Sequence, residues 1–113
     1  IISLKLIKRV LQRMIIYGLK NCDACKTLLK AQPQFELVDV SITPVPENLL
    51  NEALKIFGEK LINKSSTTWR KLDTETREQK PLDIIRLNPK VMKRPLVQLK
   101  SGELLLGSEA LKD

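Results

Sequence analysis

Residues 14–25 have the sequence MIIYGLKNCDAC, in which a short apolar run leads directly into a Cys-x-x-Cys motif. The run from Met14 to Gly18 is typical of a central β-strand that is buried on both faces. After a turn, residues 23–31 have the pattern of a helix that ends before Pro33. Residues 35–40, with the sequence FELVDV, predict a second strand. We therefore expect the chain to open with a β-α-β unit joined by a right-handed crossover.

The remainder of the chain predicts helices followed by a β-hairpin. One segment has apolar residues at helical spacing, and a second begins with Pro81 and stops before Pro89. Two later apolar runs flank a short turn that contains glycine. The helices are expected at residues 47–57 and 81–87, and the hairpin strands at residues 96–99 and 103–106. Ser108 is a candidate N-cap for a final helix over residues 108–112. The predicted fold class is α/β, with a helical insertion between a βαβ part and a ββα part.

The two cysteines, Cys22 and Cys25, stand at the start of the first predicted helix. Their spacing places both sulfurs on one face of that helix. The partial positive charge of a helix N-terminus favours a thiolate, and Lys20 and Lys26 add nearby charge, so we expect a lowered pKa at Cys22. Cys25, one turn deeper, can resolve a mixed disulfide formed at Cys22. A Cys-x-x-Cys motif within a βαβ unit predicts a thioredoxin-like redox site.

Composition excludes several other kinds of site. The chain has no histidine, which excludes Ser-His and Cys-His catalysis, and its two cysteines are too few for a four-cysteine zinc site. The alternatives for the motif are two buried structural cysteines or half of a metal site shared across a dimer. No apolar stretch approaches the roughly 18 residues that a membrane span needs. The lack of further cysteine pairs is typical of a protein from a reducing cytoplasm.

The first thirteen residues differ from the rest of the chain. They contain four basic residues and no acidic residue, so they supply +4 of the formal net charge of +7 and leave +3 for the rest. That remainder, with an aromatic content of 4%, does not predict a nucleic-acid surface. Residues 1–13 have the spacing of a basic amphipathic helix, as on a membrane surface, but the strand pattern begins only at Met14. We expect residues 1–13 to be an N-terminal extension, residues 14–113 to be one domain, and neither nucleic acid nor membrane to be a direct partner.

Two polar segments are candidates for binding an anion. Residues 65–70, with the sequence SSTTWR, combine hydroxyl groups with the Arg70 guanidinium, which can bind an oxyanion or a carboxylate. The same pattern is also typical of a solvated helix N-terminus with an exposed arginine. The second segment is Lys93-Arg94-Pro95, directly before the first hairpin strand. A cis Arg94–Pro95 bond would turn free main-chain groups toward the cysteines, although a trans bond is the more common state.

These motifs together resemble the ArsC/Spx/YffB family, over residues 14–113. The resemblance rests on Tyr17-Gly18 through Cys22 and Cys25-Lys26, on TTWRKL at residues 67–72, and on residues 88–97. It implies a thioredoxin-like fold, with Cys22 as the nucleophile, Arg70 and Arg94 as oxyanion-binding residues, and Pro95 as a cis-proline. The family's arsenate reductases have a further arginine after the last strand, where this chain reads Leu106-Gly107-Ser108. That departure fits the YffB-like branch, for which glutathione-dependent thiol reduction is the suggested activity.

Two functions of different class follow from the motifs and the resemblance. In the first, the chain is an enzyme in which Cys22 attacks a disulfide, a glutathione adduct or an oxyanion. Glutathione or another thiol is then the co-substrate, and no bound cofactor is required. In the second, the chain resembles the Spx redox-sensing regulators, which bind RNA polymerase. We favour the enzyme, because an interaction module does not need Arg70 and Arg94 to converge on the thiol. We also expect the protein to be a monomer and to be cytoplasmic.

Overall fold

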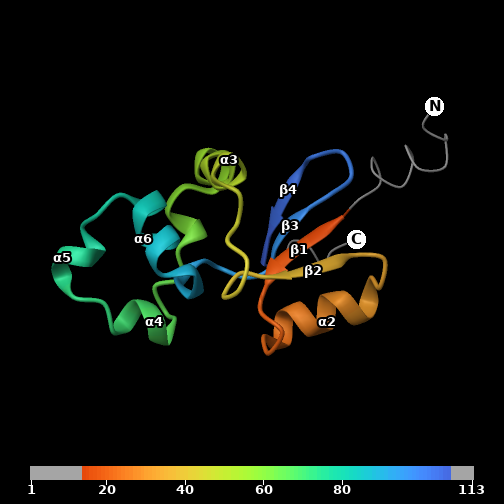
Figure 1. The fold of residues 1–113 in the computed structure, drawn as a ribbon, viewed down its shortest axis with the longest axis horizontal. Coiled ribbons are helices and arrows are strands. Elements are labelled where there is room, and N and C mark those ends of the chain that lie inside the picture. The colour runs from red at the N-terminus through yellow and green to blue at the C-terminus, as the bar shows by residue number, and fades with distance from the viewer. Residues whose placement is uncertain (1–13, 108–113) are drawn as a thin grey trace. The chain divides into compact units, whose positions relative to one another are not determined.

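The computed structural model describes residues 14–107, which form a β-α-β unit, then a run of helices and then a β-hairpin, in the predicted order (Figure 1). The strands are β1 (Ile15–Gly18), β2 (Glu36–Asp39), β3 (Leu96–Gln98) and β4 (Leu104–Leu106). The α-helices are α2 (Asp23–Ala31), α3 (Glu47–Phe57), α4 (Thr67–Arg70), α5 (Thr74–Arg77) and α6 (Pro81–Leu87), with 3-10 turns η1 (Gly58–Leu61) and η2 (Pro89–Val91). The chain divides into two compact units. We call them the sheet unit (described residues 14–38 and 94–107) and the helical unit (residues 39–93).

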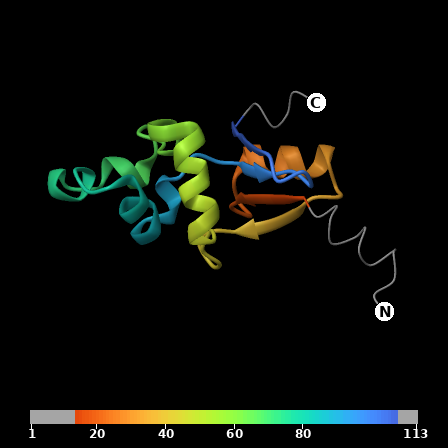
Figure 2. The ribbon, with the colours of Figure 1, turned by 90° about the horizontal axis from the view of Figure 1, so that it is seen from above.

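The sheet unit contains a four-stranded sheet with the order β2-β1-β3-β4. β3 pairs antiparallel with both β1 and β4, so that Ile16 lies opposite Val97 and Val97 opposite Leu105. β1 is therefore a central strand, as its apolar sequence predicts. Helix α2 lies along one face of the sheet (Figure 2). Leu28 of α2 packs there with Ile16 and Val97 in a buried cluster.

The hairpin of β3 and β4 turns at the predicted glycine. The amide of Gly102 donates to the carbonyl of Leu99 at 2.8 Å, and Gly102 has a φ of +90°. A residue with a Cβ rarely adopts that conformation. The turn chemistry therefore sets the register that places Leu96 opposite Leu106.

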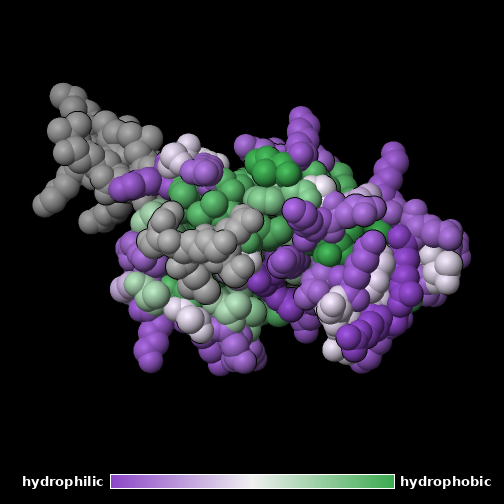
Figure 3. Space-filling view, turned by 180° about the vertical axis from the view of Figure 1, so that it is seen from behind, coloured by the Kyte–Doolittle hydropathy of each residue, from purple (hydrophilic) through white to green (hydrophobic). Residues whose placement is uncertain are grey.

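The helical unit is held by the apolar faces of α3 and α6, which were both predicted at the observed bounds. Their buried residues are Leu49, Leu50 and Ala53 in α3, and Ile84 and Ile85 in α6. An isolated antiparallel bridge joins Ile62, directly after η1, to Met92, near the C-terminal end of the unit. Hydrophilic side chains predominate over this unit on the face that Figure 3 shows.

The predicted α/β class, with helices inserted between a βαβ part and a hairpin, is confirmed. The helices α4 and α5 are additional to those predicted from spacing, because a single helical turn is too short to display an apolar period. Within residues 14–107, no helix has the length and apolar character that crossing a membrane requires. The expected extension at residues 1–13 and the expected final helix at residues 108–112 lie outside the described residues.

Candidate active site

Cys22 is the N-cap residue of α2, with an extended backbone at φ −84° and ψ 122°. Its amide donates to the carbonyl of Leu19 at 3.1 Å, which closes the turn after β1, and its carbonyl accepts from the amide of Lys26 at 2.9 Å. The first amides of a helix have no partner within the helix. In this geometry they lie around the Cys22 side chain, which is partly exposed. The fold thus places an accessible sulfur at the positive end of α2.

The pKa of Cys22 is lowered below the usual value of a thiol. Burial acts in the opposite direction, but it is outweighed by the Cys25 amide and thiol, the Ala24 amide and the charge of Arg94. The predicted direction is therefore confirmed. The positive charge that contributes to this shift is that of Arg94. A lowered pKa increases the fraction of reactive thiolate at neutral pH.

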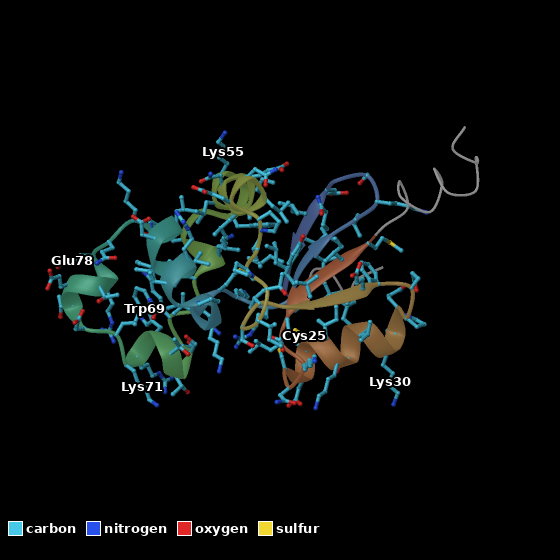
Figure 4. The ribbon with its side chains drawn as sticks, in the orientation of Figure 1. Cys25, Lys30, Lys55, Trp69, Lys71 and Glu78 are labelled. Carbon is cyan, nitrogen blue, oxygen red and sulfur yellow. The ribbon has the colours of Figure 1, made fainter. Side chains whose placement is uncertain are left out.

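Cys25 has the opposite environment, since its side chain is fully buried at 0% exposure. Burial raises the pKa of Cys25 to about 11; a hydrogen bond from the Leu19 backbone opposes the shift, and the neighbouring Cys22 adds to it. Figure 4 shows Cys25 near the start of α2. Both cysteines are free thiols. The two sulfurs are therefore chemically unequal, because the pKa of Cys22 is lowered and that of Cys25 is raised.

Gly18, the last residue of β1, is packed against the Cys25 side chain. A Cβ at Gly18 would overlap the sulfur of Cys25 and lie 3.3 Å from its Cβ. The small residue is therefore needed to let the strand and α2 approach each other at the thiol. In the sequence, Gly18 stands out only as part of a motif, and this packing role is not predicted from it. The available signal was a glycine at the end of a strand that leads into a Cys-x-x-Cys turn.

Arg94 and Pro95 lie in the same unit as the cysteines. The Arg94–Pro95 peptide bond is cis, and the buried Pro95 directly precedes β3. The carbonyl of Pro95 accepts from the amide of Gly107 at 2.8 Å, which ties it to the end of β4. The positive charge of Arg94 lowers the pKa of both Cys22 and Cys25. The structure thus brings Arg94 within electrostatic reach of the thiols, although it is distant from them in sequence.

Arg70 is the last residue of α4, in the helical unit, and its side chain is exposed. The start of α4 has the predicted polar cap: the Ser66 hydroxyl accepts from the amide of Trp69 at 3.1 Å and donates to the carbonyl of Asn63 at 2.8 Å. The convergence of Arg70 with Arg94 on Cys22 stays a prediction.

Among residues 14–107, no cluster of three or more His, Cys, Asp or Glu side chains could hold a metal ion.

A comparison with protein families and curated proteins gave two matches. The sequence model described as "ArsC family" matches residues 17–110. A protein from Haemophilus influenzae, described as uncharacterized, is 36% identical over 101 residues, a match that covers 81% of this chain and 88% of that protein.

Solved structures show the same architecture. A protein named YffB superposes with a TM-score of 0.73 at 25% identity, over 83% of this chain and 90% of that chain. A Brucella melitensis protein described as related to arsenate reductase (ArsC) superposes with a TM-score of 0.64 at 25% identity, over 89% of this chain and 96% of that chain. A Streptococcus mutans protein described as a possible arsenate reductase superposes with a TM-score of 0.65 at 22% identity, over 85% of this chain and 91% of that chain. The predicted thioredoxin-like fold is confirmed.

Proposed function

We propose that this chain, which belongs to the ArsC family, is a thiol-dependent reductase with Cys22 as its nucleophile. The observation that carries the proposal is the inequality of the two thiols. Cys22 is partly exposed with a lowered pKa, whereas Cys25 is buried with a pKa raised to about 11. Nucleophilic thiols in enzymes are accessible and carry a depressed pKa, whereas structural cysteines are buried and inert.

In the first step, the Cys22 thiolate attacks one sulfur of a disulfide substrate such as a glutathione adduct. A mixed disulfide forms at Cys22, and the other sulfur leaves as a thiolate that takes a proton from water. A thiol then attacks the mixed disulfide, which returns Cys22 to the thiolate. For a glutathione adduct, the glutathione stays on Cys22 in the mixed disulfide and the substrate leaves as its free thiol, so one molecule of glutathione releases Cys22 and forms oxidised glutathione. A disulfide without glutathione needs two molecules, because the first releases Cys22 as a new glutathione adduct and the second reduces that adduct. With arsenate, the same thiolate would form a sulfur–arsenic bond as one arsenate oxygen leaves as water. Attack of glutathione on the Cys22 sulfur would then release arsenite and leave a Cys22–glutathione disulfide, which a second glutathione reduces to give oxidised glutathione.

The environment of Cys25 bears on which thiol carries out the second step. A pKa of about 11 leaves very little Cys25 thiolate at neutral pH, so an external thiol has the advantage. Part of that raised pKa comes from Cys22 itself, and this part is lost once Cys22 is in a mixed disulfide. We therefore propose glutathione, or a similar small thiol, as the main resolving agent, with Cys25 as a slower alternative.

The two arginines would supply the affinity for an anionic substrate. Glutathione carries carboxylates, and arsenate is an oxyanion, so both suit guanidinium groups that can bind two oxygens at once. Arg94 acts on Cys22 through its charge, and we propose that Arg70 joins it when substrate binds. The lack of an arginine at residues 106–108 favours glutathione-dependent thiol reduction over arsenate reduction, as in the YffB-like branch of the family.

The test is a turnover assay with glutathione and either bis(2-hydroxyethyl) disulfide or arsenate. We expect Cys22→Ser to abolish turnover and Cys25→Ser to retain most of it, because an external thiol replaces the resolving step. Wild-type turnover in the Cys22→Ser protein would overturn the proposal. No turnover with either substrate, together with redox-dependent binding to RNA polymerase, would favour the regulator instead.

A further inference from the structure

The helices α4 and α5 are both single turns, spanning Thr67–Arg70 and Thr74–Arg77. An isolated turn of this length is not stable in water, because nucleation costs more than one or two hydrogen bonds return. Each turn has a capped start: Ser66 caps α4, and Asp73 caps α5 by accepting from the amide of Thr76 at 2.8 Å. At the other end of α4, which carries Arg70, the carbonyl of Trp69 accepts from the amide of Leu72 at 3.1 Å, and a side chain is a further partner of the last carbonyls.

That partner is Arg77, the last residue of α5. Its Nη2 donates to the carbonyl of Arg70 at 2.9 Å and to the carbonyl of Trp69 at 3.2 Å, and its Nε donates to the same Trp69 carbonyl at 3.3 Å. The last carbonyls of a helix lack partners within the helix and carry partial negative charge. One guanidinium thus satisfies two of them and neutralises the C-terminal end of α4.

The Trp69 ring holds the guanidinium of Arg77 in place from a second direction. The Cζ of Arg77 lies 5.4 Å from the centroid of the ring, and the Nζ of Lys64 lies 5.9 Å from the same centroid. Both distances are within the range of a cation–π interaction. In Figure 4, Trp69 lies between α4 and α5, whereas Lys71 and Glu78 point away from it. Arg77 is therefore restrained by the backbone and by a side chain of α4.

We propose that Arg77 is a positioning residue for Arg70. By fixing the carbonyls of Trp69 and Arg70, it determines the orientation of the last residue of α4 and thus the direction in which the Arg70 side chain leaves the helix. The inference rests on the proposed function, in which Arg70 binds the anionic part of the substrate. Lysine at position 77 would keep the charge but lose the planar group that donates to two carbonyls at once.

The experiment compares how fast Cys22 reacts with anionic iodoacetate and with neutral iodoacetamide in the full chain. The ratio of the two rates reports the positive field at the thiol without requiring the natural substrate. It is measured for the wild type, Arg70→Ala, Arg77→Lys, Arg77→Met and the Arg70→Ala/Arg77→Lys double variant. The matched control is Arg86→Lys, since Arg86 is an exposed arginine of the helical unit whose Nη1 lies 3.7 Å from Glu47. Thermal melting is recorded for every variant.

We expect Arg70→Ala to lower the rate ratio about threefold, because it removes a cation that attracts the anionic reagent. Arg77→Lys should lower the ratio about twofold and Arg77→Met further, with the iodoacetamide rate unchanged in both. In the Arg70→Ala background, Arg77→Lys should have no further effect, because two residues that act through one path are not additive. Arg86→Lys should leave the ratio at its wild-type value.

The experiment distinguishes failure of the anion-binding role of Arg70 from failure of the positioning role of Arg77. If Arg70→Ala lowers the ratio but Arg77→Lys does not, the positioning role is wrong and the role of Arg70 stands. An equal effect of Arg77→Lys with and without Arg70 also overturns the positioning role, because Arg77 then acts by another route. If Arg70→Ala leaves the ratio unchanged, the anion-binding role of Arg70 fails, and the inference about Arg77 fails with it. A change in melting temperature alone would assign Arg77 a purely structural role.

Discussion

The pKa of Cys22 is lowered by its position at the start of α2 and by the charge of Arg94, which together outweigh the effect of burial. The amides of α2 are part of the backbone and cannot be removed by a side-chain substitution. The charge of Arg94 can be removed, and its effect on the thiol is therefore the part of the site that mutagenesis can measure directly.

Replacing Arg94 with alanine should raise the pKa of Cys22, because a cation that favours the thiolate is lost. At pH values between the wild-type pKa and the raised one, the thiolate fraction falls and alkylation by iodoacetamide slows; well above both values the rates should agree. The measurement is the rate of Cys22 alkylation as a function of pH. Arg94→Lys is the matched control, since it keeps the charge. A pKa that is the same in the alanine variant would contradict the electrostatic role of Arg94.

Gly18→Ala should destabilise the fold by about 1–3 kcal/mol, the usual cost of overpacking a core, because the new Cβ would overlap the Cys25 sulfur. Urea unfolding measures the change in the free energy of unfolding. The control is the same substitution in a Cys25→Ala background, where the sulfur is absent and the cost should fall. If the cost is equal in both backgrounds, the contact with the Cys25 sulfur is not what requires glycine at this position.

At the scale of elements, the short helix α4 shows how a local hydrogen-bond network can support a functional segment. Ser66 caps the helix, and its hydroxyl donates to the main-chain carbonyl of Asn63. The side-chain carbonyl of Asn63 accepts from the amide of Ser65 at 3.0 Å. Residues 65–70, for which the sequence left open a polar helix N-terminus, do contain one, with Ser66 as its N-cap.

Ser66→Ala should therefore cost about 1 kcal/mol of stability, the typical effect of removing an N-cap side chain. Chemical denaturation of the full chain provides the measurement. Ser65→Ala is the control, because Ser65 donates to Asn63 through its backbone amide, and that bond survives the substitution. A Ser66→Ala protein as stable as the wild type would mean that α4 does not depend on its cap.

At the scale of the whole molecule, the described residues 14–107 include the cysteines and the arginines of the proposed active site. β1 begins at Ile15, and the amide of Glu36 donates to the carbonyl of Met14 at 2.9 Å, so the sheet needs the chain from residue 14 onward. The site residues Cys22, Cys25 and Arg94 act on one another within the sheet unit.

Removing residues 1–13 should leave the melting temperature and the Cys22 alkylation rate close to those of the full chain. The reason is that the strand pattern and the thiol environment both arise from later residues. Differential scanning calorimetry and timed alkylation of the two proteins would test this. A drop of more than about 5 °C in melting temperature, which for a domain of this size corresponds to roughly 1 kcal/mol, would show that the segment contributes to the core.

The amino-acid sequence by itself determined the order of elements, the bounds of α2, α3 and α6, and the position of the cysteine pair at the start of a helix. These features depend on neighbours within one helical turn or one hairpin: the spacing of apolar residues, a proline at a helix start and a glycine at a turn. The lowered pKa of Cys22 was also predictable, since much of it comes from amides of the same helix.

Only the tertiary structure decided which distant residues act on the thiols. Arg94 reaches Cys22 because β3 pairs with β1 in the sheet, and no local pattern specifies that pairing. The close packing of Gly18 on Cys25, the cis state of the Arg94–Pro95 bond, and the guanidinium of Arg77 at the end of α4 likewise depend on how separate segments meet. These features depend on burial and hydrogen bonding between segments that are far apart in the sequence. The local spacing of residues does not say which distant segments come into contact.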